Sequence, residues 1–218
     1  MQTDTDKETL VHIPVDGVTL EGALAIPVNA QGLVLFVHGS GSSRFSPRNN
    51  FVARELRNAG LGTLLIDLLT RVEDQDYERR FDIPLLTQRV ARVTDWLQTQ
   101  AQTKKLTLGY FGASTGAAAA LQVAAAPGNK VNAMVSRGGR PDLAGVQALA
   151  QVHCPVLLIV GGHDDIVIEL NKQAHARLVC PKELVIVPGA THLFEEPGTL
   201  EQVAKLAADW FHRHLNIA

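Results

Sequence analysis

Short apolar runs alternate with amphipathic stretches along most of this chain. Residues 33–37 are a continuous apolar run, which is typical of a strand covered on both faces, and residues 61–66 predict a second buried strand. Further runs predict strands at 106–111, 131–135, 156–160 and 183–187. Between the runs, the spacing of apolar residues predicts helices at 46–59, 86–97, 115–126, near 143–151, at 168–178 and at 198–215. This alternation predicts an α/β fold with a mainly parallel sheet and helices on both faces.

The beginning of the chain has a different pattern. Residues 9–15 and 18–26 alternate apolar and polar side chains around Asp16-Gly17, a dipeptide that favours a tight hairpin turn. We therefore expect antiparallel strands at one edge of the sheet. No repeat, linker or low-complexity segment divides the sequence, so residues 1–218 are expected to form a single domain.

Composition and charge exclude several classes of protein. Hydrophobic residues make up 46% of the chain, which is typical of a globular protein. The net charge is −2, so the chain lacks the excess of basic residues that binding to nucleic acid or to an anionic membrane requires. No apolar stretch is long enough to span a bilayer, and the N-terminal residues are polar, unlike a secretory signal. We therefore expect a cytoplasmic protein with no membrane or nucleic-acid partner, in which Cys154 and Cys180 are reduced core thiols.

The most informative motif is Gly112-Ala113-Ser114-Thr115-Gly116, which fits G-x-S-x-G. A strand-forming run precedes it and an alanine-rich helix-forming run follows it. A serine on such a sharp strand-to-helix turn projects its hydroxyl into the open, and the helix N-terminus behind it supplies free N–H groups. The sequence therefore predicts Ser114 as a nucleophile; the alternative is a glycine-rich junction with an incidental serine.

A serine nucleophile needs a base on a loop within its reach. Among the eight histidines, His192 fits best, because it lies in a loop just past the last predicted strand. Parallel strands present their carboxyl ends at one edge of a sheet, and ligands bind at that edge. His192 is therefore the predicted general base.

The base in turn needs a carboxylate to orient it. Asp164 and Asp165 both follow the strand at 156–160, and we favour Asp164. Asp165 is expected instead to cap the helix that starts near Ile168. Glu195 and Glu196 are reserve candidates, but they are close to His192 in the sequence. Three adjacent residues rarely converge on one ion, so we expect no metal at His163-Asp164-Asp165.

An oxyanion hole requires two backbone N–H groups. Thr115 supplies one, directly after the nucleophile. The other is expected from the loop 38–43, His-Gly-Ser-Gly-Ser-Ser, with Ser40 as the donor. A phosphate-binding loop is the alternative for this segment, but the lysine and the spacing of such a loop are missing. We expect no cofactor.

Evidence for the substrate is sparse in the sequence. Arg44 and Arg137 follow strands at the same sheet edge, where an arginine could grip a substrate carboxylate, or else form a stabilising ion pair. Asp67 is expected to be a structural hydrogen-bond acceptor at its strand end. The charged segment 70–82 either covers part of the site or is a solvated surface loop.

Together these segments resemble the α/β-hydrolase superfamily, whose chain order of serine, acid and histidine they share. The segments 38–44, 67–70, 112–117 and 189–194 are similar to the dienelactone-hydrolase-like branch. The resemblance covers nearly the whole chain. It implies an eight-stranded sheet whose second strand is antiparallel, and a triad of Ser114, Asp164 and His192.

Two departures from that branch are informative. Its name-giving members use cysteine where this chain has Ser114, so dienelactone specificity does not carry over. Many α/β-hydrolases insert a helical lid before the strand at 156–160, whereas here only residues 136–155 are available. We therefore expect no large lid domain and a small, open pocket shaped by loops.

The sequence thus predicts a serine hydrolase that acts on a small-molecule ester, thioester or lactone-like carbonyl compound through an acyl-enzyme. Two alternatives remain at this point. The same triad could transfer the acyl group to another acceptor or to peroxide, or the fold could serve as a non-catalytic binding module. The oligomeric state does not follow from the sequence.

Overall fold

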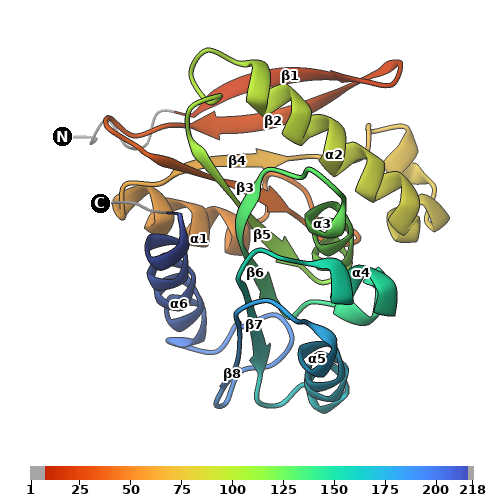
Figure 1. The fold of residues 1–218 in the computed structure, drawn as a ribbon, viewed down its shortest axis with the longest axis vertical. Coiled ribbons are helices and arrows are strands. Elements are labelled where there is room, and N and C mark those ends of the chain that lie inside the picture. Colours follow the sequence, from red (N-terminus) through yellow and green to blue (C-terminus); the bar gives the residue numbers. More distant parts are fainter. Residues whose placement is uncertain (1–7, 216–218) are drawn as a thin grey trace.

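The computed structural model describes residues 8–215; the polar N-terminal residues 1–7 and residues 216–218 lie outside the described part. Eight strands form one sheet in the order β1-β2-β4-β3-β5-β6-β7-β8, as Figure 1 shows. The strands are β1 (Thr9–Val15), β2 (Val18–Ala25), β3 (Gly32–Val37), β4 (Gly62–Ile66), β5 (Thr107–Ala113), β6 (Val131–Arg137), β7 (Val156–Gly161) and β8 (Lys182–Val187). Across the sheet, each pair of neighbouring strands in the series β4-β3-β5-β6-β7-β8 is parallel. Strand β2 is antiparallel to both of its neighbours, β1 and β4. The predicted α/β-hydrolase fold, with its antiparallel second strand, is confirmed.

Helices cover both faces of the sheet (Figure 1). They are α1 (Pro47–Asn58), α2 (Ile83–Thr99), α3 (Thr115–Ala125), α4 (Val146–Gln151), α5 (Asp165–Arg177) and α6 (Thr199–His214). Helices α1 and α6 pack together on one face, and α2, α3, α4 and α5 lie on the other. Each face has its own buried core. The alanine-rich α3 is buried almost all round, so it can pack closely behind the middle of the sheet.

The opening hairpin forms where the alternating pattern predicts it. Val15 pairs with Val18, and the two residues between them both have positive φ, 44° for Asp16 and 85° for Gly17. Two such residues form the kind of turn whose twist matches that of the flanking strands. The hairpin therefore forms one edge of the sheet, and β8 forms the opposite edge.

The start of α5 differs from the prediction. The helix begins at Asp165 rather than near Ile168, and Asp164 occupies the N-cap position. The Ile168 N–H donates to the Asp164 carbonyl at 2.8 Å, which closes the first helical turn three residues earlier than expected. The expectation that Asp165 caps this helix is therefore wrong.

Little chain is inserted between β6 and β7. It contains one turn of 3₁₀ helix (Pro141–Ala144) and the short α4, and within residues 8–215 there is no large lid domain. The charged segment 70–82 also contains two 3₁₀ turns, Glu73–Gln75 and Glu78–Phe81. Since neither insertion forms a separate layer, the carboxyl edge of the sheet is bordered by loops.

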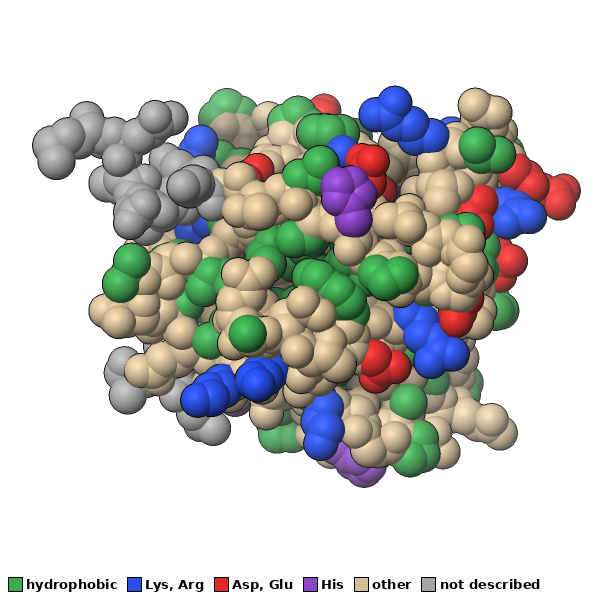
Figure 2. Space-filling model, turned by 90° about the horizontal axis from the view of Figure 1, so that it is seen from above, with side chains coloured by type: hydrophobic (Ala, Val, Ile, Leu, Met, Phe, Trp, Pro, Cys, Tyr) green, Lys and Arg blue, Asp and Glu red, His purple; other side chains and the backbone are tan. Residues whose placement is uncertain are grey.

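Figure 2 views the molecule from the side of β1 and β2, the top of Figure 1, where hydrophobic, acidic and basic side chains are all exposed. None of the helices within residues 8–215 combines the length and the apolar character that crossing a bilayer requires. In the same part of the chain, no group of three or more histidine, cysteine, aspartate or glutamate side chains is placed to hold a metal ion.

Candidate active site

Ser114 lies on a strained turn between β5 and α3. Its φ of 50° and ψ of −125° fall in a region that non-glycine residues rarely adopt. The neighbouring backbone is packed so tightly that only glycine fits at two positions. A Cβ at Gly116 would lie 2.2 Å from the Val37 carbonyl oxygen, and one at Gly112 would lie 2.6 Å from the Ala117 Cα. The sequence motif therefore folds into the sharp turn that its glycines predict.

His192 lies past β8 and, within residues 8–215, pairs with one carboxylate. Its Nδ1 is 2.6 Å from Asp164 Oδ2, and the Asp164 side chain is only 15% exposed. Asp164 makes no capping hydrogen bond to α5, so its carboxylate is available to the imidazole. Gly161 makes room for this contact, because a Cβ there would lie 2.5 Å from the carbonyl oxygens of Ala190 and Thr191.

The other three carboxylates near His192 have different positions. Asp165 is the first residue of α5. Glu195 pairs with Arg48 at 2.9 Å, and Glu196 accepts the Thr191 N–H at 3.0 Å. Of the four candidates from the sequence, the structure brings only Asp164 to His192.

Ser114 and His192 flank the same backbone stretch at the end of β6. The Ser114 N–H donates to the Arg137 carbonyl at 3.4 Å. The next residue, Gly138, adjoins the imidazole, since a Cβ there would lie 3.5 Å from His192 Nδ1. Within residues 8–215 no hydrogen bond joins the Ser114 hydroxyl to His192. Catalytic hydrogen bonds are often long or poorly aligned before substrate binds, so the lack of this contact does not exclude Ser114 and His192 as partners.

The expected oxyanion loop packs directly on the nucleophile. A Cβ at Gly39 would lie 2.8 Å from Ser114 Cβ and 3.5 Å from Ser114 Oγ. His38 holds the loop from behind, because its Nδ1 donates to the Gly39 carbonyl at 2.9 Å and its Nε2 accepts the Leu68 N–H at 3.4 Å. Burial lowers the pKa of His38, which favours the neutral ring that these two contacts require.

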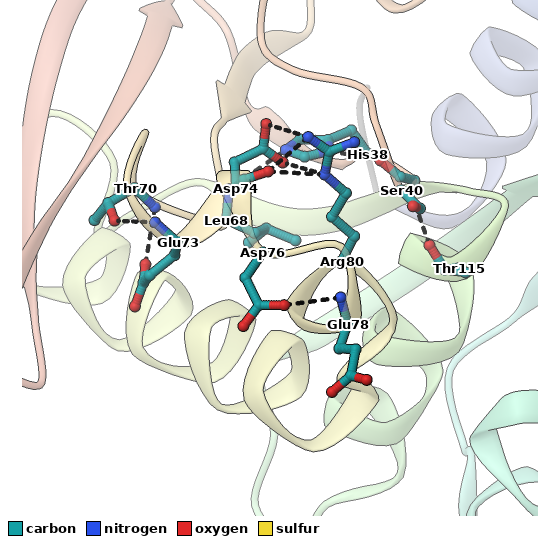
Figure 3. Close-up of polar contacts among 11 residues, drawn as sticks. His38, Ser40, Leu68, Thr70, Glu73, Asp74, Asp76, Glu78, Arg80 and Thr115 are labelled. Carbon is teal, nitrogen blue, oxygen red and sulfur yellow. Dashed lines mark hydrogen bonds and ion pairs between the residues drawn. The ribbon is translucent and has the colours of Figure 1, made fainter.

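The two expected oxyanion donors differ in their surroundings. The Thr115 N–H is the first of α3 and has no acceptor within the described residues. The Ser40 N–H, by contrast, donates to the Thr115 hydroxyl at 3.0 Å, as Figure 3 shows. The sequence suggested the backbone donors but missed this contact. The only hint of it was a hydroxyl on the residue that follows the nucleophile.

Arg44 belongs to an ion-pair cluster and is not free to bind substrate. Its guanidinium pairs with Asp67 and also with Glu21, at 2.6 Å for the latter, and its side chain is 10% exposed. Its backbone N–H donates to Asp67 Oδ1 at 2.6 Å. Asp67 is thus the strand-end acceptor that the sequence predicts. Of the two roles expected for Arg44, the structure favours the stabilising ion pair, because two protein carboxylates already neutralise its charge.

Arg137 is buried without such neutralisation. The residue is 7% exposed, and within residues 8–215 no carboxylate pairs with it. One nitrogen donates to the Asn49 side-chain oxygen at 3.3 Å, and its Nε has no acceptor among the described residues. Burial, together with the nearby Arg48 charge, lowers the pKa of Arg137 to about 10. Of Arg44 and Arg137, only Arg137 lacks a counter-charge among the described residues.

The charged segment 70–82 borders the oxyanion loop. Glu73 pairs with the buried Arg89 at 2.8 Å and fixes the segment to α2. Arg80 donates to Asp74 and lies 3.9 Å from the position of a Cβ on Gly41 (Figure 3). A cavity of about 200 Å³ lies between the segment and the loop, lined by residues that include His38, Ser42, Arg44, Asp67 and Arg71.

This fold, with a serine on the β5 turn and a histidine–carboxylate pair at the same sheet edge, defines the chain as an α/β-hydrolase. The sequence profile of the Dienelactone hydrolase family matches residues 20–217. The chain belongs to that family.

Similar proteins agree on the fold. A crystallised dienelactone hydrolase from Anabaena variabilis is 54% identical with a TM-score of 0.92, and the match covers 96% of this chain and 98% of that one. Est1E from Butyrivibrio proteoclasticus has a TM-score of 0.81 at 16% identity, with 95% and 99% covered, and shows the fold alone.

A putative phosphoribosyl transferase of Mycobacterium tuberculosis is 57% identical over 205 residues, which are 94% of this chain but 46% of that protein. The chain therefore spans about half the length of the curated relatives it matches. Because the family profile covers residues 20–217, the aligned half of that relative corresponds to the hydrolase-fold part.

Proposed function

We propose that this protein is a serine hydrolase that acts on the ester, thioester or lactone-like carbonyl group of a small molecule. The observation that carries the proposal is the 2.6 Å contact between His192 Nδ1 and Asp164 Oδ2 beside a strained Ser114. Membership of the dienelactone hydrolase family supports hydrolysis as the reaction type.

In the proposed mechanism, Ser114 Oγ attacks the substrate carbonyl carbon and His192 Nε2 takes the hydroxyl proton. Asp164 accepts the Nδ1–H, which fixes the tautomer with Nε2 free to act as base and stabilises the imidazolium that forms. The leaving group departs with a proton from His192. Water then attacks the acyl-enzyme with His192 as base again, and Ser114 is regenerated.

Negative charge develops on the carbonyl oxygen during both attacks. The Thr115 N–H, at the positive end of the α3 dipole, is one donor to that oxygen. The Ser40 N–H is the second donor proposed from the sequence. The close packing of Gly39 on Ser114 brings this loop to the nucleophile, but the Ser40 N–H itself donates to Thr115 Oγ1.

Arg137 is proposed to favour substrates that carry a negative charge. A buried cation without a counter-charge is costly, and a substrate carboxylate would offset that cost. The test compares KM for an anionic ester, such as a hemisuccinate, with KM for a neutral ester of equal length. Arg137→Met is expected to raise the first KM by at least about tenfold and leave the second unchanged. Equal effects on both substrates would exclude this role.

A fluorophosphonate probe tests the nucleophile. The wild type is expected to be labelled, and Ser114→Ala to lose both labelling and ester hydrolysis. Ser136→Ala is a matched control, since Ser136 is a buried serine at the end of the adjacent strand whose hydroxyl makes no hydrogen bond to the described residues. Equal labelling of the wild type and Ser114→Ala would refute the proposal.

The alternatives have separate signatures. An acyltransferase or perhydrolase would be labelled at Ser114 as well, but an added alcohol, amine or peroxide would compete with water for the acyl group. A binding module would neither label nor turn over a broad panel of acyl esters. Both measurements use the same purified chain.

A further inference from the structure

The Ser40 N–H, which the sequence predicts as an oxyanion donor, already donates a hydrogen bond. Its acceptor is the side chain of Thr115, the residue that supplies the other predicted donor. The Ser40 N–H donates to Thr115 Oγ1 at 3.0 Å, across 75 residues of sequence (Figure 3). Thr115 is 4% exposed, so this hydroxyl is withdrawn from bulk water. The arrangement therefore places a side-chain oxygen between the Ser40 backbone and the nucleophile turn.

Tight packing holds this contact in place. A Cβ at Gly116 would lie 2.2 Å from the Val37 carbonyl oxygen and 2.4 Å from that of His38. The first turn of α3 thus presses on the end of β3, while Gly39 presses on Ser114 from the same loop. Ser40 and Thr115 directly adjoin Gly39 and Gly116 in the sequence, so these two close approaches restrict how far their hydrogen-bonded groups can move relative to the nucleophile.

Thr115 carries two donors that have no acceptor within residues 8–215: its backbone N–H and its hydroxyl proton. A hydroxyl can accept and donate at once. Because Oγ1 accepts from Ser40, its own proton is directed away from that N–H. A buried donor without an acceptor is costly, so both groups favour an acceptor that arrives with the substrate.

We propose that the Thr115 hydroxyl is itself an oxyanion donor, polarised by the Ser40 N–H, in the hydrolase reaction proposed above. As Ser114 Oγ bonds to the carbonyl carbon, the C=O π electrons move onto oxygen and the Ser114 proton moves to His192. The oxyanion then accepts two hydrogen bonds from Thr115, one from the N–H and one from the hydroxyl. Chained hydrogen bonds strengthen one another, so the Ser40 N–H acts through Thr115. No proton leaves Thr115.

Three variants separate this role from a structural one. Thr115→Val keeps the shape and removes the hydroxyl, Thr115→Ala removes it without crowding, and Thr115→Ser restores it. The control is Thr199→Val, because Thr199 is also a buried threonine at the first position of a helix. The measurements are kcat and KM for one activated ester, and the inhibition constant of a boronic acid that forms a tetrahedral adduct.

Loss of an oxyanion donor typically costs about 10²-fold in kcat. Thr115→Val and Thr115→Ala are expected to lose about that factor in kcat and in boronic acid affinity, with KM changed by less than about threefold. Thr115→Ser and Thr199→Val are expected to stay near the wild type. Should Thr115→Val fail to fold, the alanine and serine pair gives the same contrast.

A Thr115→Val or Thr115→Ala enzyme with wild-type or higher kcat would overturn the proposal, since a freed Ser40 N–H would then serve the oxyanion unaided. Failure of the proposed function has a different signature. In that case the wild type itself would show neither fluorophosphonate labelling that depends on Ser114 nor turnover. An active, Ser114-labelled wild type with insensitive Thr115 variants rejects this inference alone.

Discussion

Replacing Gly39 by alanine tests whether the close approach of the oxyanion loop sets the geometry of the site. The new Cβ would lie 2.8 Å from Ser114 Cβ and 3.0 Å from the Ala113 carbonyl oxygen. Carbon atoms in contact are normally about 3.5–4.0 Å apart, so the loop or the serine turn must move by roughly 1 Å. Overpacking of this kind costs about 1–3 kcal/mol of stability. A displacement of about 1 Å at the reacting groups costs about 10²-fold in rate.

The assay for Gly39→Ala is kcat for an activated ester, normalised to the fraction of folded protein. Gly62→Ala is the matched control, because a Cβ there would lie 2.9 Å from Leu33 Cδ1 at the opposite end of the sheet. Both variants are expected to lose stability in denaturant, and only Gly39→Ala to lose about 10²-fold in kcat. A folded Gly39→Ala protein with wild-type kcat would show that the 2.8 Å approach does not position the reacting groups.

Three further predictions follow from particular contacts. Asp164→Asn should lower kcat by about 10³–10⁴-fold, whereas Asp165→Asn should remain near the wild type; equal losses in ester hydrolysis would contradict the assignment. Burial raises the pKa of the Glu73 carboxyl, but hydrogen bonds from Thr70 and the charges of two arginines outweigh it and lower the pKa below 4.5. The stability that ionised Glu73 provides is thus present above pH 4.5 and lost as the pH falls below it, so urea unfolding of the wild type and Glu73→Gln should converge at low pH. Burial raises the pKa of the Cys154 thiol to about 12 and also raises the pKa of the Cys180 thiol. A thiol reagent at pH 8 should therefore modify neither cysteine until denaturant is added. Rapid labelling of the native protein would contradict this prediction.

Much of the fold could be predicted from local patterns. The strand at 33–37, the Asp16-Gly17 turn and the alanine-rich helix after Ser114 all lie where the sequence places them. Each depends on residues close together in the chain, so periodicity and turn chemistry suffice. The start of α5 was missed by three residues, because the Asp164 carbonyl closes a turn that apolar spacing does not reveal.

The candidate site could be predicted only in part. The sequence determined the elbow at Ser114, since two glycines and a following helix former allow few other backbones there. The tertiary structure decided which of the residues that follow the strands contact one another. It brought Asp164 to His192, paired Arg44 with Asp67 and Glu21, and left Arg137 without a carboxylate partner among residues 8–215. These contacts join distant segments, and a hydrogen bond requires its two atoms to be placed within a few tenths of an ångström. Residue spacing along the chain does not carry that precision, whereas the packing of loops at the end of a rigid sheet does.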